Sequence, residues 1–259
     1  VESDFDVIGI SKGDQYLNIY QLGRNKRLDL DESFRLFASF SMDWAEFIRL
    51  INAYESYKKA NNKVDFTDMI EEFIARNEPI DIDALFVDEA QDLSTLQWDM
   101  IEVLRRKPRI KYFTGDDDQA IMGFQGADVS RFLTATKEKQ VLEESHRLPK
   151  QAWHEAQRIV SRIYNREQKV WNPKSEDGLV RYHQSLWDVP LHEGEWTIMC
   201  RTNFILSGYA NMLRDDGIVF SRNGKMSIPT KTYNAVTDWQ RLIKGNVITI
   251  QQLRNIYSF

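Results

Sequence analysis

The sequence is poor in cysteine and in long apolar stretches. Its single cysteine, Cys200, excludes an intrachain disulfide among the 259 residues. The longest apolar runs, such as 84–87 and 197–200, are strand-sized and far below the roughly 20 residues that cross a bilayer. The opening segment is acidic and lacks the apolar core of a signal peptide. We therefore expect a soluble, intracellular, cytoplasmic protein with no membrane partner.

The composition is that of an ordinary globular protein, with 42% hydrophobic and 28% charged residues. The length predicts one large domain or two smaller ones. The net charge of −5 conceals an asymmetry, because residues 1–92 carry 20 acidic and 10 basic residues. Residues 93–259 carry 19 acidic and 24 basic residues. A polyanionic partner is therefore expected to bind the C-terminal part rather than the N-terminal part.

The N-terminal third contains turn signals followed by helical periodicity. Residues 1–30 predict short strands and turns, with Gly9, Gly13 and Gly23 as breaks. Residues 43–60 predict an amphipathic helix, and Asp65 is expected to cap the next one. The stripe expected to be buried on that second helix consists of Phe66, Met69, Ile70, Phe73 and Ile74.

A strand–helix–strand alternation follows and predicts an α/β fold with a parallel sheet. The apolar run 84–87 and the segment 109–113 are the expected strands, and a helix lies between them. Ligands in such sheets bind outside the carboxyl ends of the strands. Asp88-Glu89 and Gly115-Asp116 both follow such ends.

The remainder predicts a second α/β pattern and a helical tail. Helices are expected at about 149–165 and 203–216, and two more from about Thr232, separated by Gly245-Asn246. Further strands are expected at 141–142, 179–183, 196–200 and 218–220.

Two adjacent carboxylates at the end of a buried strand are costly unless a cation compensates them. Mg²⁺ takes one or two protein carboxylates and completes its shell with water and phosphates. Asp88 can therefore hold the metal while Glu89 activates a water, which is the Walker B arrangement of P-loop NTPases. A surface turn that happens to be acidic is the simpler alternative for an isolated pair.

Residues 114–127 read Thr-Gly-Asp-Asp-Asp-Gln-Ala-Ile-Met-Gly-Phe-Gln-Gly-Ala. Together with Asp-Glu-Ala-Gln-Asp at 88–92, this segment resembles motifs III and II of the UvrD/Rep-type superfamily 1 DNA helicases. Three more stretches resemble family motifs in the expected order, and they lie at 64–70, 142–149 and 199–203, the last followed by 213–220.

The resemblance implies RecA-like P-loop NTPase motor domains that bind ATP and Mg²⁺. By this resemblance Asp88 holds Mg²⁺, Glu89 is the general base, and Gln119 senses the γ-phosphate. Arg147 contacts that phosphate across the cleft. The remaining residues on the nucleotide side are Asp116 and His146, the latter at the position of a tyrosine that stacks on adenine.

The resemblance also implies a single-stranded DNA partner. Phe124 is expected to stack on a base, next to Met122. Met122 replaces the family's tyrosine and Gln125 its arginine, and both changes weaken the inferred stacking platform. Arg201 and Asn203 are further candidate contacts to the strand.

Simpler structural roles compete with three of these assignments. Phe124 could belong to the core, Asn203 could cap the helix that follows it, and Arg147 could be a surface cation beside Glu143 and Glu144.

The phosphate-binding motif G-x-x-x-x-G-K-[ST] is absent from the sequence. The nearest stretch, Gly224-Lys225, is followed by Met226 where Ser or Thr is required. We expect an internal piece of a helicase, incomplete at both ends and inactive alone unless a residue such as Lys12 substitutes. The expected parts are an accessory 1B-like region at 1–62, the end of the first motor domain at 63–148, the start of the second at 149–231 and a 2B-like insertion from 232–259.

The sequence therefore predicts part of an ATP-dependent DNA helicase or translocase. The resemblance implies a monomer that moves 3′ to 5′ in DNA repair or replication in a prokaryote or phage. The alternative is a helicase-like module that binds single strands or a protein partner without hydrolysis, which the changes at Met122, Gln125 and His146 favour. A third possibility is an unrelated magnesium-dependent phosphotransferase built on Asp88 and Asp116, which leaves Gln119 without a role.

Overall fold

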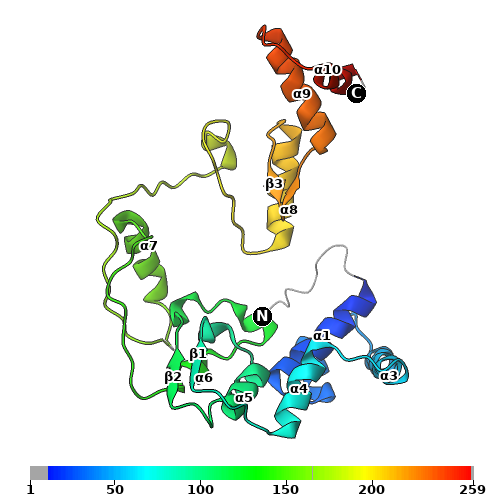
Figure 1. Ribbon diagram of the computed structural model, residues 1–259, viewed down its shortest axis with the longest axis vertical. Coiled ribbons are helices and arrows are strands. Elements are labelled where there is room, and N and C mark those ends of the chain that lie inside the picture. Colours follow the sequence, from blue (N-terminus) through cyan, green and yellow to red (C-terminus); the bar gives the residue numbers. More distant parts are fainter. Residues whose placement is uncertain (1–10, 165, 258–259) are drawn as a thin grey trace. The chain divides into compact units, whose positions relative to one another are not determined.

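The computed structural model describes residues 11–164 and 166–257. The chain divides into two compact units, with the boundary after Arg181 (Figure 1). The four-part division expected from the sequence stays a prediction. Within the described ranges, no helix is long and apolar enough to cross a membrane.

The first unit begins with four helices, α1 (Lys12–Lys26), α2 (Leu30–Phe37), α3 (Trp44–Ala60) and α4 (Phe66–Arg76). The prediction of short strands and turns is wrong for the described part of residues 1–30, because α1 occupies most of it. Gly9 lies outside the described residues. Ser11 caps α1, since its Oγ accepts a hydrogen bond from the Asp14 amide at 3.2 Å.

Gly23 serves close packing rather than a turn. A Cβ at this position of α1 would collide with Ser33 Oγ and lie only 2.6 Å from Ser33 Cβ. Ser33 belongs to α2 and is 1% exposed. The glycine therefore lets α1 and α2 approach one another, which is a reason for glycine that local sequence patterns do not reveal.

An apolar cluster joins the first three helices. Tyr16 and Ile19 of α1 are buried against Phe47 and Ile51 of α3. Phe34 of α2 completes the cluster, with its ring centroid 5.1 Å from that of Phe47. The predicted helix 43–60 is confirmed, and Asp43 caps it through the Glu46 amide.

The cap of α4 was predicted correctly, and its buried stripe only in part, since Ile70, Phe73 and Ile74 are half-buried. Asp65 and Asp68 form a capping box, so the helix begins where the sequence indicates. Phe66 is 87% and Met69 55% exposed, whereas the buried residue of α4 is Thr67. The reason is polar, because the two aspartates form ion pairs with Arg24 of α1 and Lys58 of α3, and this fixes which side of α4 faces inward.

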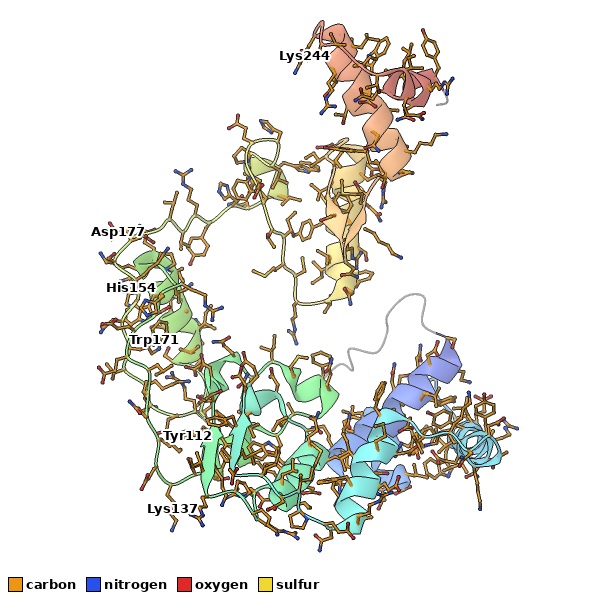
Figure 2. The ribbon with its side chains drawn as sticks, viewed as in Figure 1. Tyr112, Lys137, His154, Trp171, Asp177 and Lys244 are labelled. Atoms are coloured by element: carbon orange, nitrogen blue, oxygen red, sulfur yellow. The ribbon has the colours of Figure 1, made fainter. Side chains whose placement is uncertain are left out.

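Two short parallel strands, β1 (Ala84–Val87) and β2 (Ile110–Phe113), lie side by side as predicted (Figure 1). Between them in sequence lies α5 (Thr95–Leu104). One face of β1 packs against α5, where Leu85 and Val87 contact Trp98. On the other face Phe86 and Tyr112 stack at 5.4 Å and are exposed, and Figure 2 labels Tyr112.

Short helical elements follow each of the two strands along the chain. These are η1 (Ala90–Asp92), η2 (Asp117–Gln119), η3 (Met122–Gln125) and α6 (Val129–Thr134), followed by α7 (Lys150–Val160). The helix predicted at 149–165 is therefore confirmed but shorter. The strand predicted at 141–142 is wrong, since Leu142 is exposed and has no ladder partner among the described residues. The strand predicted at 179–183, across the unit boundary, is wrong for the same reason.

The second unit contains η4 (Leu186–Asp188), α8 (Asn203–Asp215), the hairpin β3 (Ser221–Arg222) and β4 (Lys225–Met226), and two helices, α9 (Thr230–Ile243) and α10 (Ile250–Tyr257). The predicted tail helices are confirmed. The strands predicted at 196–200 and 218–220 are wrong, because neither segment joins a strand ladder among the described residues. The Phe220 carbonyl accepts a 2.7 Å hydrogen bond from the Ser227 amide beside the hairpin.

Gly224 lies in the turn of this hairpin, and Lys225 is the first residue of β4. Asn223 and Gly224 both have positive φ, at 51° and 74°, as a two-residue hairpin turn requires. The segment is therefore a tight β-turn and not a phosphate-binding loop.

Candidate functional site

The site residues of the first unit lie at the carboxyl ends of β1 and β2. The parallel register pairs Val87 with Phe113, so Asp88 and Thr114 are the next residues on neighbouring strands. Thr114 Oγ1 donates a 2.5 Å hydrogen bond to Asp88 Oδ1, which also accepts from the Glu89 amide at 3.0 Å. The two bonds hold the pKa of the exposed Asp88 carboxyl below its usual range, and the bond from Thr114 makes the larger contribution.

Glu89 occupies the left-handed region with φ 49°, which turns the chain sharply after the strand. Its Oε2 accepts a 2.9 Å hydrogen bond from Gln91 Nε2. Gln91 is 2% exposed, and its Oε1 accepts from the Asp116 amide at 3.1 Å. A single buried amide thus connects the acidic turn after β1 to the loop after β2.

The loop after β2 requires a glycine at its first turn. A Cβ on Gly115 would collide with Gln91 Oε1 and approach the Phe132 ring at 3.1 Å. The next residue, Asp116, holds Gln119 twice. Asp116 Oδ2 accepts from Gln119 Nε2 at 2.7 Å, and the Asp116 carbonyl accepts from the Gln119 amide at 2.9 Å. The structure therefore brings Asp116 and Gln119 together.

The segment 122–126 presents its aromatic side chain outward. Phe124 is 57% exposed, so the alternative that it belongs to the core is wrong. Met122 is half-buried. The segment is anchored at its C-terminal end, because Gly126 lies against Asn25 of α1 and Ala127 forms a β-bridge with Ser94.

Two basic residues that were not predicted from the sequence bind the loop after β2, at residues 116–118. Arg166 donates to both carboxylate oxygens of Asp118, at 2.7 and 2.6 Å. Lys169 Nζ lies 2.5 Å from Asp116 Oδ1, 2.5 Å from Asp117 Oδ1 and 3.0 Å from Asp118 Oδ2. Both cations are largely buried, with side chains 8% and 13% exposed. Because about 50 residues separate them from the aspartates, no local pattern could have found them.

The ionisation of these groups follows from their contacts. Burial disfavours the charged form of Lys169, but the hydrogen bonds to Asp116, Asp117 and Asp118 outweigh it and raise the pKa of the ammonium. Burial likewise disfavours the Asp118 carboxylate, and Arg166 and Lys169 outweigh it and lower its pKa. Lys169 and Asp118 are therefore both charged at neutral pH.

His146 and Arg147 lie on an exposed turn that precedes α7. The turn is held by a bridge between Glu144 and Asn172 and by Ser145 Oγ, which accepts from the Arg147 amide at 3.3 Å. Arg147 is exposed and its guanidinium forms no ion pair within the described residues, so its alternative role as a surface cation beside Glu143 and Glu144 stays open.

Arg201 and Asn203 lie in the second unit. Thr202, not Asn203, caps α8, because its Oγ1 accepts from the Ile205 amide at 3.3 Å. The alternative role of Asn203 as a cap is therefore wrong. Asn203 Oδ1 accepts instead from Arg222 Nη2 at 3.3 Å, and Arg201 is exposed.

The Asp88 carboxylate is suited to act as one ligand of Mg²⁺. Its carboxyl is ionised and exposed, and Oδ2 accepts no hydrogen bond from the described residues, so it is available to a cation. The described part of the chain holds no group of three or more metal-ligating side chains. Mg²⁺ bound here would therefore take most of its shell from water and phosphate oxygens, which is its usual preference.

Lys12 does not stand free as a substitute phosphate ligand. It forms an ion pair with Glu46 of α3, and this contact raises the pKa of the ammonium.

A parallel strand pair with acidic residues at its carboxyl ends defines a site of the kind that binds ligands in α/β domains. Residues 14–140 match the UvrD/REP helicase N-terminal domain, and the chain is similar to that family in this region. The match implies that a RecA-like fold is partly present.

Individual relatives agree with this assignment. The ATP-dependent DNA helicase Rep of Buchnera aphidicola is 33% identical over 96 residues, 34% of this chain and 14% of the relative. The probable DNA helicase II homolog of Mycoplasma genitalium is 29% identical over 147 residues, 52% of this chain and 19% of the relative. The helicase PcrA of Staphylococcus aureus is 24% identical over 150 residues, 52% of this chain and 20% of the relative. The chain thus covers a fifth or less of each relative.

Proposed function

We propose that this chain is part of an ATP-dependent DNA helicase or translocase, which couples ATP hydrolysis to movement along single-stranded DNA. The observation that carries the proposal is the hydrogen bond from Thr114 to Asp88. It joins the acidic turn after β1 to the loop that contains Gln119, and both lie in the region related to the UvrD/REP helicases. The relatives' printed names describe DNA helicases, which supports the same activity here.

On this proposal each residue at the strand ends has a distinct role. Asp88 is already ionised and offers Oδ2 to Mg²⁺. Glu89 takes a proton from the attacking water, and the bond from Gln91 orients its carboxylate. Bound MgATP supplies the phosphoanhydride bond that is hydrolysed. Gln119, whose side-chain amide is oriented by Asp116, contacts the γ-phosphate, and Arg147, which is exposed, completes the contacts from a separate turn.

The DNA side of the proposal rests on exposed aromatic and polar residues. Phe124 is available to stack on a base, and such stacking tolerates any sequence. Arg201 and Asn203 remain candidate strand contacts, and His146 remains the candidate for stacking on adenine. Movement in the 3′ to 5′ direction, a role in repair or replication, a monomeric state and a cytoplasmic location complete the proposal.

A second candidate function is a helicase-like module that binds single strands without hydrolysis. The observation that favours it is the set of departures from the family pattern at Met122, Gln125 and His146. In this case the fixed contact between Asp116 and Gln119 would be structural.

The rate of ATP hydrolysis separates the two candidates. It should be measured with and without an oligo(dT) strand, for the protein expressed from the reading frame that encodes this chain and for the 259-residue chain alone. Stimulation by the oligonucleotide in the encoded protein supports the motor. Oligo(dT) binding without hydrolysis in either sample supports the binding module and contradicts the motor.

A further inference from the structure

The loop that carries Gln119 is held by a cluster of five charged side chains. Asp116, Asp117 and Asp118 come from the loop, and Arg166 and Lys169 come from the segment after α7. We call this set the loop clamp. Asp117 and Asp118 have side chains only 3% and 10% exposed. A buried set of charges costs desolvation energy and is tolerated only when every member is paired, which is the case here.

The backbone adds to the clamp. The Glu167 amide donates a 2.7 Å hydrogen bond to Asp117 Oδ2, so the segment 166–169 is bound along its length and not at one side chain only. Glu167 itself pairs with Lys139 at 2.5 Å. The segment 166–169 is therefore bound to the loop aspartates and, through Glu167, also to Lys139.

Asp116 transmits the effect of the clamp to Gln119. Its two carboxylate oxygens are divided, since Oδ1 binds Lys169 and Oδ2 binds Gln119 Nε2 at 2.7 Å. Gln119 is exposed and makes no other side-chain bond among the described residues. The orientation of its amide is consequently set by a carboxylate that Lys169 holds in place.

We propose that Lys169 and Arg166 are positioning residues, which fix the Asp116–Gln119 loop and thereby orient Gln119 for contact with the γ-phosphate of ATP. The role of Gln119 in this inference rests on the proposed function. The clamp itself rests only on the contacts above. Neither cation touches the nucleotide in this account, so their loss should misplace Gln119 without removing a nucleotide contact.

Amide hydrogen exchange of the 259-residue chain tests the clamp without ATP or DNA. The variants are Lys169→Met, the charge-conserving Lys169→Arg, and the control Lys150→Met, which removes an exposed lysine paired with Asp177. Lys169→Met should speed exchange of the amides at 117–120 about tenfold, equivalent to about 1.4 kcal/mol of local stability. Exchange in α5 should not change, Lys169→Arg should restore most of the protection, and Lys150→Met should behave as wild type.

Two results would overturn the clamp. One is unchanged exchange at 117–120 in Lys169→Met. The other is equal acceleration in the loop and in α5, which would mean that the lysine only stabilises the unit.

The kinetics of ATP hydrolysis by the encoded protein test the positioning role. Lys169→Met should lower kcat about tenfold with KM within about threefold, since misplacing a transition-state contact reduces kcat. Lys169→Arg should recover kcat. If the wild type hydrolyses ATP and Lys169→Met has the same kcat, the proposed positioning role of Lys169 is overturned. If the wild type itself does not hydrolyse ATP, the proposed function has failed, and hydrogen exchange still decides whether the clamp exists.

Discussion

Thr114 Oγ1 donates a 2.5 Å hydrogen bond to Asp88 Oδ1 across the ends of the two parallel strands. The bond stabilises the carboxylate and not the acid, because a hydroxyl that donates to an anion favours the charged form. It is the first cause of the lowered pKa of Asp88, ahead of the Glu89 amide. Thr114, the residue after β2, therefore favours the ionised form of Asp88, the expected metal ligand after β1.

Thr114→Val should raise the pKa of Asp88 toward its usual value. Valine keeps the shape of the side chain and removes the donor, while the Glu89 amide bond remains. The titration of the Asp88 carboxyl carbon, followed by NMR in the wild type and the variant, measures this shift. Thr136→Val is the matched control, because Thr136 Oγ1 donates to the Glu138 carbonyl elsewhere in the unit. An unshifted Asp88 in Thr114→Val would show that the hydroxyl has no such effect.

Gly23→Ala should destabilise the first unit by about 1–3 kcal/mol, the usual cost of overpacking a well-packed core. The added Cβ collides with Ser33, which is buried and cannot move away freely. Urea denaturation gives the free energy of unfolding.

Gly13→Ala is the control in the same helix. The nearest atoms to a Cβ at Gly13 lie at 3.6 and 3.7 Å, which is ordinary contact. This substitution should leave stability unchanged or raise it by about 0.4–1 kcal/mol by reducing the entropy of the unfolded chain. Equal effects of Gly13→Ala and Gly23→Ala would contradict the packing role of Gly23.

The local sequence predicted those elements whose pattern and packing agree. The helix 43–60, the cap at Asp65 and the two parallel strands were predicted because capping residues and apolar periodicity act over a few residues. Predictions failed where distant contacts decide. Gly23 was predicted to mark a turn, but it lies inside α1, where it allows the close approach of Ser33. Phe66 was predicted to be buried, but ion pairs on another side of α4 leave it exposed.

The candidate site divides in the same way. Asp88, Glu89, Asp116 and Gln119 follow strand ends and could be predicted from the motif. Arg166 and Lys169 could not be predicted, because their partners lie about 50 residues earlier and only the fold brings them together. The strand predicted at 196–200 failed for the same reason, because an apolar run does not show whether a distant segment pairs with it.

The unfolding free energy of the first unit should fall as the pH is lowered. Burial opposes ionisation of Asp65, but the Asp68 amide and then Lys58 outweigh it and hold its pKa far below the usual range. A carboxyl with a depressed pKa stabilises the fold above its unfolded pKa of about 3.9 and loses this contribution as the pH falls. Urea denaturation at pH 7 and at pH 3 measures the difference.

Asp65→Asn should reduce this pH dependence. Asparagine still caps a helix, so the substitution removes the charge that faces Arg24 and Lys58 and keeps the cap. Asp81→Asn, at an exposed residue, is the control and should leave the pH dependence as in the wild type. A pH dependence in Asp65→Asn as steep as that of the wild type would contradict the role of the Asp65 carboxylate.

Phe124→Ala should weaken binding of the chain to single-stranded DNA. The loss of one stacked base is worth about 1–3 kcal/mol, or roughly 5- to 150-fold in affinity. Because Phe124 is 57% exposed, the substitution should cost little stability. Fluorescence anisotropy of labelled oligo(dT) measures the affinity, with Phe40→Ala as the control at another exposed phenylalanine. Equal affinities of both variants would exclude stacking on Phe124.

The exchange of Glu89 for glutamine tests the central claim most directly. Single-strand-stimulated ATP hydrolysis should be compared in the encoded protein, Glu89→Gln and the control Glu78→Gln, which alters an exposed glutamate. Glutamine keeps the shape and cannot take a proton, so the rate in Glu89→Gln should fall by at least about 100-fold, and Glu78→Gln should retain wild-type activity. Hydrolysis at the wild-type rate in Glu89→Gln, or no hydrolysis in the wild type, would contradict the assignment of this acidic turn as the catalytic centre of a motor.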